Sequence, residues 1–282
     1  MLKILHISDL HFGPFHWDGN DEDLIRRINS YDADLVINTG DSTSDGVERE
    51  YLQAKNFLGK IKCSNLISIA GNHDKRSRSS VEFFKKYILN PDVIYPDVSD
   101  EIKKKYIFLD DKMKIKEKFT DINFVKRISI HDKQILIIAL DSNILYQDTG
   151  FVEESILRSI SEKLNNDSYY LRLLLIHHSV LGADECPLLN SQRVIDFINY
   201  NKIKYIFCGH THEIDFRISE DIYNKHQFFQ FMCGATASND MGNYGNNVFV
   251  LYEIGDEAVQ RIKLVKVHSK INRLSFEEEN II

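Results

Sequence analysis

Five short apolar runs along the chain are each followed at once by a cluster of polar side chains. The runs are rich in β-branched residues and leucine, which favours buried strands over helices. In α/β sheets, functional groups gather outside the carboxyl ends of the strands, so clusters distant in sequence can meet in space. We therefore expect one site built from all five. The clusters are Asp9-Leu10-His11, Gly40-Asp41, Gly71-Asn72-His73-Asp74, His177-His178 and Gly209-His210-Thr211-His212.

Amphipathic helical patterns alternate with the apolar runs, which indicates an α/β fold. Near-continuous apolar strands separated by helices predict sheets that are covered on both faces. The predicted strands are residues 2–7, 35–38, 66–70, 135–140, 171–176 and 205–208. The predicted helices are residues 21–31, 47–61, 153–164 and 191–200, the last with Ser191 as its N-cap.

The pattern changes after Glu213. Residues 227–233, 248–254 and 261–267 are predicted as consecutive strands with turn signals between them, so the segment 227–268 is expected to close the fold with antiparallel strands. No internal repeat and no linker rich in Pro, Gly or Ser divides the chain. We therefore expect a single domain over residues 1–282.

A Lys-rich insertion at residues 102–118 stands apart from this pattern. It contains seven Lys, and in residues 112–116 the Lys alternate with apolar residues, which places them on one face of a strand. Two interpretations are open. The Lys can protect an exposed edge strand against aggregation, or they can form an electropositive rim that attracts an anionic substrate.

Composition and charge exclude several classes of protein. The 43% hydrophobic and 27% charged residues are typical of a folded soluble protein, and the net charge of -7 argues against coating nucleic acid through the overall field. The first residues lack a secretory signal, and no run reaches the roughly 18 apolar residues that cross a bilayer. The 4 Cys form no zinc or disulfide pattern. We expect a cytoplasmic protein without a membrane partner; the sequence does not predict its oligomeric state.

The chemistry of the five clusters is consistent. Carboxylates, imidazoles and one amide, without a thiolate, suit Zn, Fe, Mn, Ni or Co. Seven candidate ligands are too many for one ion, and with one carboxylate shared they divide between two. Two ions roughly 3.5–4 Å apart can clamp a phosphoryl group and generate hydroxide at neutral pH. The residues therefore predict hydrolysis of a phosphate ester.

The clusters, in this order, resemble the pattern of the calcineurin-like metallophosphoesterase family. The resemblance covers residues 9–212, about three quarters of the chain. It implies an α/β fold, a four-layer αββα sandwich of two mixed sheets with a dinuclear metal site at one edge. By the family pattern, one ion would be held by Asp9, His11 and His212, the other by Asn72, His177 and His210, and Asp41 would bridge both.

The same resemblance gives roles to three further residues. His73 would face the substrate, donating to a phosphoryl oxygen or protonating the leaving group, and Asp74 would fix its ring. Of the paired histidines, His177 is expected to be the ligand, while His178 would support the site or touch substrate.

A second resemblance narrows the substrate. Leu140-Asp141-Ser142-Asn143, followed by Gly150 and a helix, resembles the subgroup of bacterial cyclic-nucleotide and glycerophosphodiester phosphodiesterases. That subgroup usually has prolines after its paired histidines, whereas Ser179-Val180-Leu181 follows here, so the local loop is expected to differ. Residues 75–134 carry no motif of either resemblance, and we expect substrate specificity there. The loop with His16, Trp17 and Asn20 either reaches the pocket or is a surface loop anchored by Trp17.

Three functions are therefore compared. The first is a phosphodiesterase or phosphomonoesterase of small molecules, which the complete ligand set and acidic charge favour. The second is a nuclease of DNA or RNA, which the Lys-rich insertion would serve by holding a phosphate backbone. The third is a catalytically idle binding protein, because a fold alone never proves activity.

Overall fold

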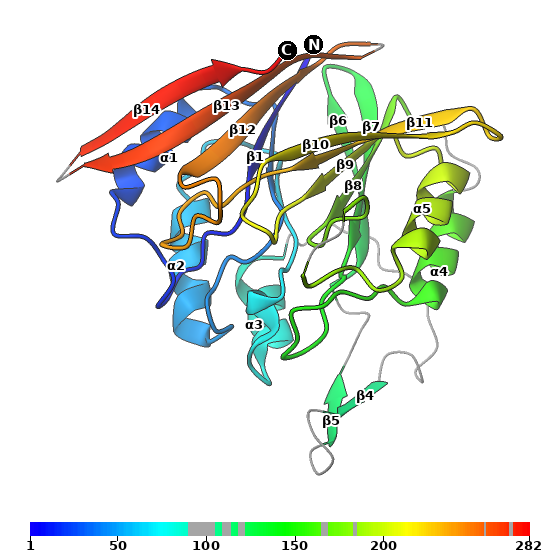
Figure 1. Ribbon diagram of the computed structural model, residues 1–282, viewed down its shortest axis with the longest axis horizontal. Helices are drawn as coiled ribbons and strands as arrows, with labels where there is room; N and C mark the ends of the chain where they lie inside the picture. The colour runs from blue at the N-terminus through cyan, green and yellow to red at the C-terminus, as the bar shows by residue number, and fades with distance from the viewer. Residues whose placement is uncertain are drawn as a thin grey trace.

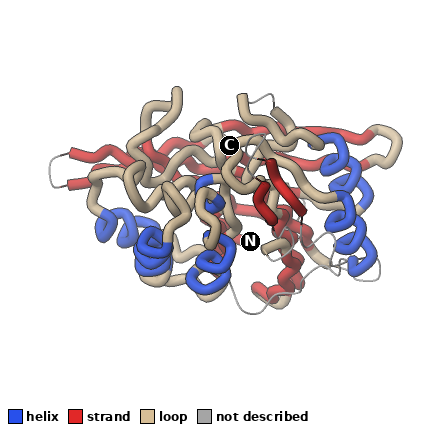
Figure 2. Tube along the Cα trace, turned by 90° about the horizontal axis from the view of Figure 1, so that it is seen from below, coloured by secondary structure: helices blue, strands red, loops and turns tan. Residues whose placement is uncertain are grey.

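Two six-stranded sheets, built largely from the predicted apolar runs, pack face to face with helices on both outer faces (Figure 1, Figure 2). The computed structural model describes residues 1–89, 105–108, 114–117, 122–164, 169–182, 185–256, 258–270 and 273–282. Three large apolar clusters fill the spaces between the four layers. The expected αββα sandwich of two mixed sheets is confirmed.

The first sheet has the strand order β14-β13-β12-β1-β2-β3. Its parallel part is made of β1 (Leu2–Ile7), β2 (Leu35–Asn38) and β3 (Leu66–Ser68). On the other side of β1, three antiparallel strands follow: β12 (Asn247–Ile254), β13 (Val259–Lys270) and β14 (Arg273–Asn280). The parallel strands all end at the same edge of the sheet, so the polar clusters after them are brought together.

The second sheet has the order β10-β11-β9-β8-β7-β6. Four neighbours are parallel: β7 (Lys133–Leu140), β8 (Leu171–Ile176), β9 (Tyr205–Cys208) and β11 (His226–Met232). Antiparallel strands form both edges, β6 (Phe124–Ile130) beside β7 and β10 (Asp215–Asp221) beside β11.

Alternation along the strands explains the layers. Leu2 and Ile4 of β1 enter the core between the sheets, whereas Leu5 and Ile7 pack under α1 (Asp21–Asn29) and α2 (Glu48–Leu58). On the opposite side of the molecule, α4 (Glu154–Leu164) and α5 (Ser191–Tyr200) cover the second sheet (Figure 1). A short helix, α3 (Ser80–Tyr87), packs beside α2.

The structure corrects two details of the predicted elements. The N-cap of α5 is Asn190, not Ser191, and the Asn190 side chain bonds to the backbone of Val152 instead of the helix. The strands of the segment 227–268 do not form one closing section. β11 joins the second sheet and runs parallel to β9, while β12 and β13 belong to the first.

The Lys-rich insertion lies mostly outside the described residues. Only the backbone of β4 (Lys105–Phe108) and β5 (Lys114–Glu117) is described, and the two form an antiparallel pair apart from the large sheets (Figure 1). Neither interpretation of its Lys is tested. Across the described part of the chain, every helix is too short or too polar to cross a membrane.

Candidate metal centre

The strand-end loops carry their polar residues in an unusual backbone conformation. Asp9, His11, Asp41, His210 and His212 all have φ between 49° and 79°. Residues other than glycine rarely adopt this left-handed region, and each costs about 1–3 kcal/mol there, so such residues collect at functional sites. Five of the seven expected ligands thus occupy strained positions that turn their side chains toward one point.

Glycines let these loops approach closely. A Cβ on Gly40, which has φ 109°, would lie 2.6 Å from the Gly71 nitrogen and 2.8 Å from Nδ1 of His177. A Cβ on Gly71 would lie 2.1 Å from Oδ1 of Asp41. The loops after β2 and β3 therefore touch at positions where only glycine fits.

Asp9, His11 and His212 form a first group of donor atoms. Nε2 of His11 lies 3.0 Å from Nε2 of His212, and Oδ1 of Asp9 lies 3.8 Å and 3.4 Å from these two nitrogens. Asp9 and His11 are buried. This is the set expected for the first ion, and its atoms lie close enough together to hold one.

Asn72, His177 and His210 form a second group. Oδ1 of Asn72 lies 2.9 Å from Nε2 of His177 and 3.1 Å from Nδ1 of His210. Asp41 stands between the two groups, with Oδ2 3.5 Å from Nε2 of His177 and 3.8 Å from Nε2 of His11. The structure thus brings all seven expected ligands together, with Asp41 between the two groups.

Backbone carbonyls orient the two histidines of the second group. Nδ1 of His177 lies 2.7 Å from the Thr39 carbonyl, and Nε2 of His210 lies 3.2 Å from the Cys186 carbonyl. A carbonyl only accepts, so each ring donates through that nitrogen, and its other nitrogen faces the group and is the one free to bind a metal ion or a proton. This arrangement is typical of histidines that bind metal.

The charges at the centre also fit a cation. Burial would raise the pKa of Asp9, but the contact with His212 outweighs it and lowers that pKa to about 2. Burial would lower the pKa of His177 and of His212, but Asp41 and Asp9 respectively raise each to about 9. Among the described residues, Oδ1 of Asp9 is buried without a hydrogen-bond donor. A metal ion would satisfy this acceptor.

His73 lies at the edge of the centre. Its Nδ1 donates to the Ser44 carbonyl at 2.8 Å, and its ring packs edge-on against His11, with the ring centroids 4.6 Å apart. One of its ring nitrogens also lies within 4.8 Å of donor atoms of His11 and Asp41. His73 is half-buried, so part of its side chain is open to solvent.

The expectation that Asp74 fixes the His73 ring is wrong. The buried Asp74 carboxylate accepts hydrogen bonds from the backbone of Ser42, Thr43 and Gly71, and from the Thr43 hydroxyl. Burial, reinforced by Asp41, raises the pKa of Asp74 to about 7. Asp74 therefore ties the loop after β2 to the loop after β3, and Ser44 holds the ring.

His178 supports the centre from behind. Its Nε2 donates to the Asp148 carbonyl at 2.9 Å, and its Nδ1 accepts from the Ser142 hydroxyl at 2.8 Å. The ring is fully buried against Gly150, where a Cβ would lie 2.7 Å from its Cγ. With both nitrogens bonded, this geometry favours a supporting role over substrate contact.

Sequence reasoning missed two residues near the second group. Lys75 is fully buried, and its ammonium lies 2.8 Å from Oδ2 of Asp141. Asp148 accepts from Nδ2 of Asn72 at 2.8 Å. Asp141 belongs to the segment that carried the second resemblance, but no local pattern singled out Lys75 or Asp148, because their partners lie 66 or more residues away.

The loop that follows Asp9-Leu10-His11 is anchored by its own hydrogen bonds and does not point toward the metal centre. Trp17 is buried and donates through Nε1 to Asp21 at 2.9 Å, and His16 bonds to the Leu10 carbonyl at 2.7 Å. Asn20 caps α1 by accepting from the backbone of Glu22 and Asp23. Of the two interpretations, the surface loop held by Trp17 matches the structure.

A groove of about 970 Å³ opens beside the second group at His210. Its lining is strongly acidic, with one guanidinium, that of Arg217, among the described lining residues. The carboxylates come from Asp148, Glu185, Glu213, Asp215 and Asp240. The groove reaches His210 of the second group, and its acidic lining disfavours a polyanion.

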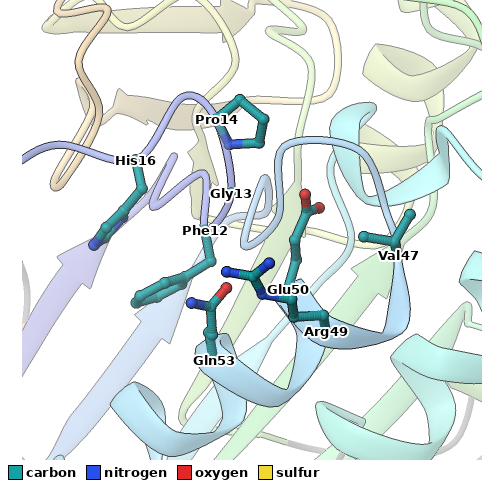
Figure 3. A pocket seen from close by; sticks show the side chains of 8 residues that line it. All are labelled: Phe12, Gly13, Pro14, His16, Val47, Arg49, Glu50 and Gln53. Carbon is teal, nitrogen blue, oxygen red and sulfur yellow. The ribbon is translucent and has the colours of Figure 1, made fainter.

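A second cavity, of about 350 Å³, lies behind the first loop (Figure 3). It is bounded by Phe12, Gly13, Pro14 and His16 on one side and by Val47, Arg49, Glu50 and Gln53 on the other. The lining contains none of the expected ligands. The Glu50 carboxylate lies against Gly13 and accepts the Asp45 N–H at 2.8 Å. This cavity is therefore separate from the metal centre.

Comparison with known proteins agrees with the fold and the centre. The sequence pattern of the calcineurin-like phosphoesterase family matches residues 2–213. The chain therefore belongs to this family of phosphohydrolases, as the resemblance predicted.

Among its relatives are two bacterial proteins named as phosphodiesterases. A probable cyclic nucleotide phosphodiesterase of Xenorhabdus bovienii is 22% identical over 228 residues, which cover 75% of this chain and 78% of that protein. A probable glycerophosphodiester phosphodiesterase of Arcobacter nitrofigilis is 28% identical over 199 residues, which cover 68% of this chain and 60% of that protein. They match the subgroup expected from Leu140-Asp141-Ser142-Asn143.

Solved structures agree on the fold. A 5′-nucleotidase of Candida albicans has a TM-score of 0.54 at 14% identity, over 94% of this chain and 51% of that one. A candidate 5′-nucleotidase of Staphylococcus aureus has a TM-score of 0.56 at 14% identity, over 96% of this chain and 55% of that one.

Proposed function

We propose that this phosphohydrolase is a dinuclear metal-dependent phosphodiesterase of small molecules. The observation that carries the proposal is the position of Asp41 between two groups of donor atoms. Each group contains three further side chains of the kind that binds first-row transition metals. We assign Asp9, His11 and His212 to one ion, Asn72, His177 and His210 to the other, and Asp41 to both. The metals we expect are Mn, Fe, Zn, Ni or Co.

A pair of metal ions would supply a nucleophilic water of lowered pKa and would neutralise charge on the phosphoryl oxygens. The chain's own residues do the rest. Thr39 and Cys186 hold the ligand rings in place through their carbonyls. Asp74 keeps the two ligand loops in contact by accepting from their backbone. We give Asp74 this supporting role.

We assign proton donation to His73. Because Nδ1 of His73 donates to the Ser44 carbonyl, a second proton binds at Nε2, and the doubly protonated ring can give that proton to the substrate. An alkoxide that leaves a phosphate ester needs such a proton. In this proposal His73 provides it, or donates a hydrogen bond to a phosphoryl oxygen.

The groove supports a diester over a monoester. Its volume of about 970 Å³ leaves room for a second alcohol group beside the centre. Its acidic lining favours a neutral or cationic group there and disfavours the polyanionic backbone of a nucleic acid. The named phosphodiesterases among the relatives agree with this preference. We propose a small diester as substrate, and a cytoplasmic location remains a prediction.

The proposal can be tested with metal-stripped protein. Hydrolysis of bis(p-nitrophenyl) phosphate and of p-nitrophenyl phosphate would be compared after adding Mn, Ni, Zn or Mg one at a time. We expect metal-dependent cleavage with preference for the diester. A preference for the monoester would make the protein a phosphatase. Inactivity with every metal would support the idle binding protein.

A second assay separates small diesters from nucleic acids. Nuclease action should fall steeply with added salt, because phosphate contacts are screened, while hydrolysis of a small ester should change little. We expect no cleavage of single-stranded or duplex nucleic acid even at low salt. Salt-sensitive cleavage would instead establish a nuclease.

A further inference from the structure

Asp148 lies on a loop that crosses the second ligand group. The loop is closed at its base, where the Phe151 N–H donates to the Ser142 carbonyl at 2.8 Å. It is also held from both sides. The Tyr146 N–H donates to the Lys75 carbonyl at 3.1 Å, and the Asp148 carbonyl accepts from His178 at 2.9 Å. The backbone of Asp148 is therefore fixed relative to Asn72.

The Asp148 carboxylate bonds directly to a proposed ligand. Its Oδ1 accepts from Nδ2 of Asn72 at 2.8 Å and from the guanidinium of Arg76 at 2.7 Å. At the other end of the Asn72 amide, Oδ1 faces Nε2 of His177 at 2.9 Å and Nδ1 of His210 at 3.1 Å. One amide thus spans Asp148 and the metal centre.

The two ends of an asparagine amide are chemically opposite. The oxygen can bind a metal, whereas the NH₂ group only donates hydrogen bonds. An ionised carboxylate only accepts, so it bonds to the NH₂ end and disfavours the flipped amide. Flipping Asn72 would place its oxygen against the Asp148 carboxylate and its NH₂ group against the histidines.

We propose that Asp148 is a positioning residue that keeps the oxygen of Asn72 turned toward the second ion and thereby sets the affinity of that site. The inference rests on the proposed function, in which Asn72 is a ligand. Asp148 is not placed among the ligands. Side chains that hold a ligand in this way typically change metal affinity by about 10–100-fold when they are removed.

The alternative is that Asp148 has only a structural role, through its ion pair with Arg76. The carboxylate is about half exposed, with 50% of the side-chain surface accessible, and exposed ion pairs contribute little to stability. If the ion pair mattered, removing Arg76 would act like removing Asp148. If the bond to Asn72 matters, removing Arg76 would leave the centre intact. The two roles therefore separate by mutation.

The test compares metal binding by the full chain and four variants. Asp148→Ala removes the acceptor, and Asp148→Asn retains an amide oxygen that can accept from Asn72 but loses the charge that enforces its orientation. Arg76→Gln removes the ion pair alone. Glu185→Gln removes one negative charge from the same groove and serves as the control for electrostatics. Binding of Mn²⁺ would be measured by calorimetry, and Co²⁺ binding by its visible absorption spectrum.

We expect the second ion to bind about 10–100-fold more weakly in Asp148→Ala, with an altered Co²⁺ spectrum for that ion. Asp148→Asn should lie between this variant and the wild type. In Asp148→Ala, the affinity for the first ion and the melting temperature should remain close to those of the wild type. Arg76→Gln and Glu185→Gln should bind both ions about as tightly as the wild type.

Unchanged affinity in Asp148→Ala would overturn the inference, and so would an equal loss in Arg76→Gln or Glu185→Gln. Failure of the proposed function has a different signature. A wild type that binds fewer than two ions, or an Asn72→Ala variant that binds both as tightly as the wild type, would remove the ligand role of Asn72. Loss of affinity in Asp148→Ala while Asn72→Ala binds normally would also refute the inference.

Discussion

The ammonium of Lys75 lies 2.8 Å from Oδ2 of Asp141, and both side chains are fully buried. The same ammonium donates to the Asn143 carbonyl at 2.8 Å. Lys75 follows the Gly71-Asn72-His73-Asp74 cluster directly, and Asp141 follows β7. The pair therefore joins a ligand loop of the first sheet to the second sheet, next to the centre.

Lys75→Met should destabilise the protein strongly. The substitution leaves the Asp141 carboxylate buried without its cation, which costs about 3–5 kcal/mol of the free energy of unfolding. Urea unfolding followed by circular dichroism would measure the loss. As a control, Lys133→Met breaks the exposed pair with Asp256 and should leave the midpoint nearly unchanged. Equal urea midpoints for the two variants would show that the buried pair contributes no more to stability than the exposed pair.

Asp41→Asn should impair both metal sites at once. Asn retains the oxygen that accepts from the His73 N–H at 2.8 Å, so the loop should keep its shape, but the bridging charge is lost. We expect metal content, measured by mass spectrometry after dialysis, to fall from two ions toward none. Asn72→Ala is the matched comparison, because it should lose the second ion and keep the first. Retention of two ions by Asp41→Asn would refute the bridging role.

The stability of the metal-free protein should depend on His177 and His212. Their pKa values are raised to about 9 in the folded chain, mainly by Asp41 and Asp9 acting against burial, whereas an unfolded His has a pKa near 6.5. A raised pKa contributes stability that is fully present below about pH 6.5 and is lost as the pH rises through about 9. Urea midpoints of the metal-free protein should therefore decrease across this window.

Two comparisons check whether His177 and His212 cause this pH dependence. His212→Gln should flatten the decrease, because one of the two titrating groups is gone. Added Mn²⁺ should bind more tightly as the pH rises, since the metal competes with protons for the same nitrogens. A midpoint that stays constant from pH 6.5 to 9 in the metal-free wild type would contradict the raised pKa values.

The central strands and the convergence of the expected ligands were predictable for the same physical reason. β1, β2, β8 and β9 begin and end where the apolar runs do, because strands buried on both faces need an unbroken run of apolar residues. Their carboxyl ends meet at one edge, so polar residues directly after them converge without further information. All seven expected ligands follow this rule.

Edge elements and supporting contacts were not predictable in this way. β10 and β14 lie at sheet edges and mix charged with apolar residues, so they lack the apolar signal of a buried strand. The hydrogen bonds of Asp74 were missed because its carboxylate oxygens accept from backbone N–H groups, and the direction of those groups depends on how the loops fold. The contact between Asp148 and Asn72 spans 76 residues and has no local pattern.

His73→Ala should slow hydrolysis without releasing metal. Nδ1 of His73 is bonded to the Ser44 carbonyl, and we assign proton donation to its Nε2. Loss of a general acid typically lowers kcat by about 10²–10⁴-fold. The decrease should be largest for an alkyl diester, whose alkoxide needs the proton, and smaller for bis(p-nitrophenyl) phosphate, whose leaving group is weakly basic. His16→Ala removes a histidine outside the centre and should leave kcat unchanged. Loss of both ions in His73→Ala would instead make His73 a ligand. Equal decreases in kcat for the two diesters would mean that His73 donates to a phosphoryl oxygen and not to the leaving group.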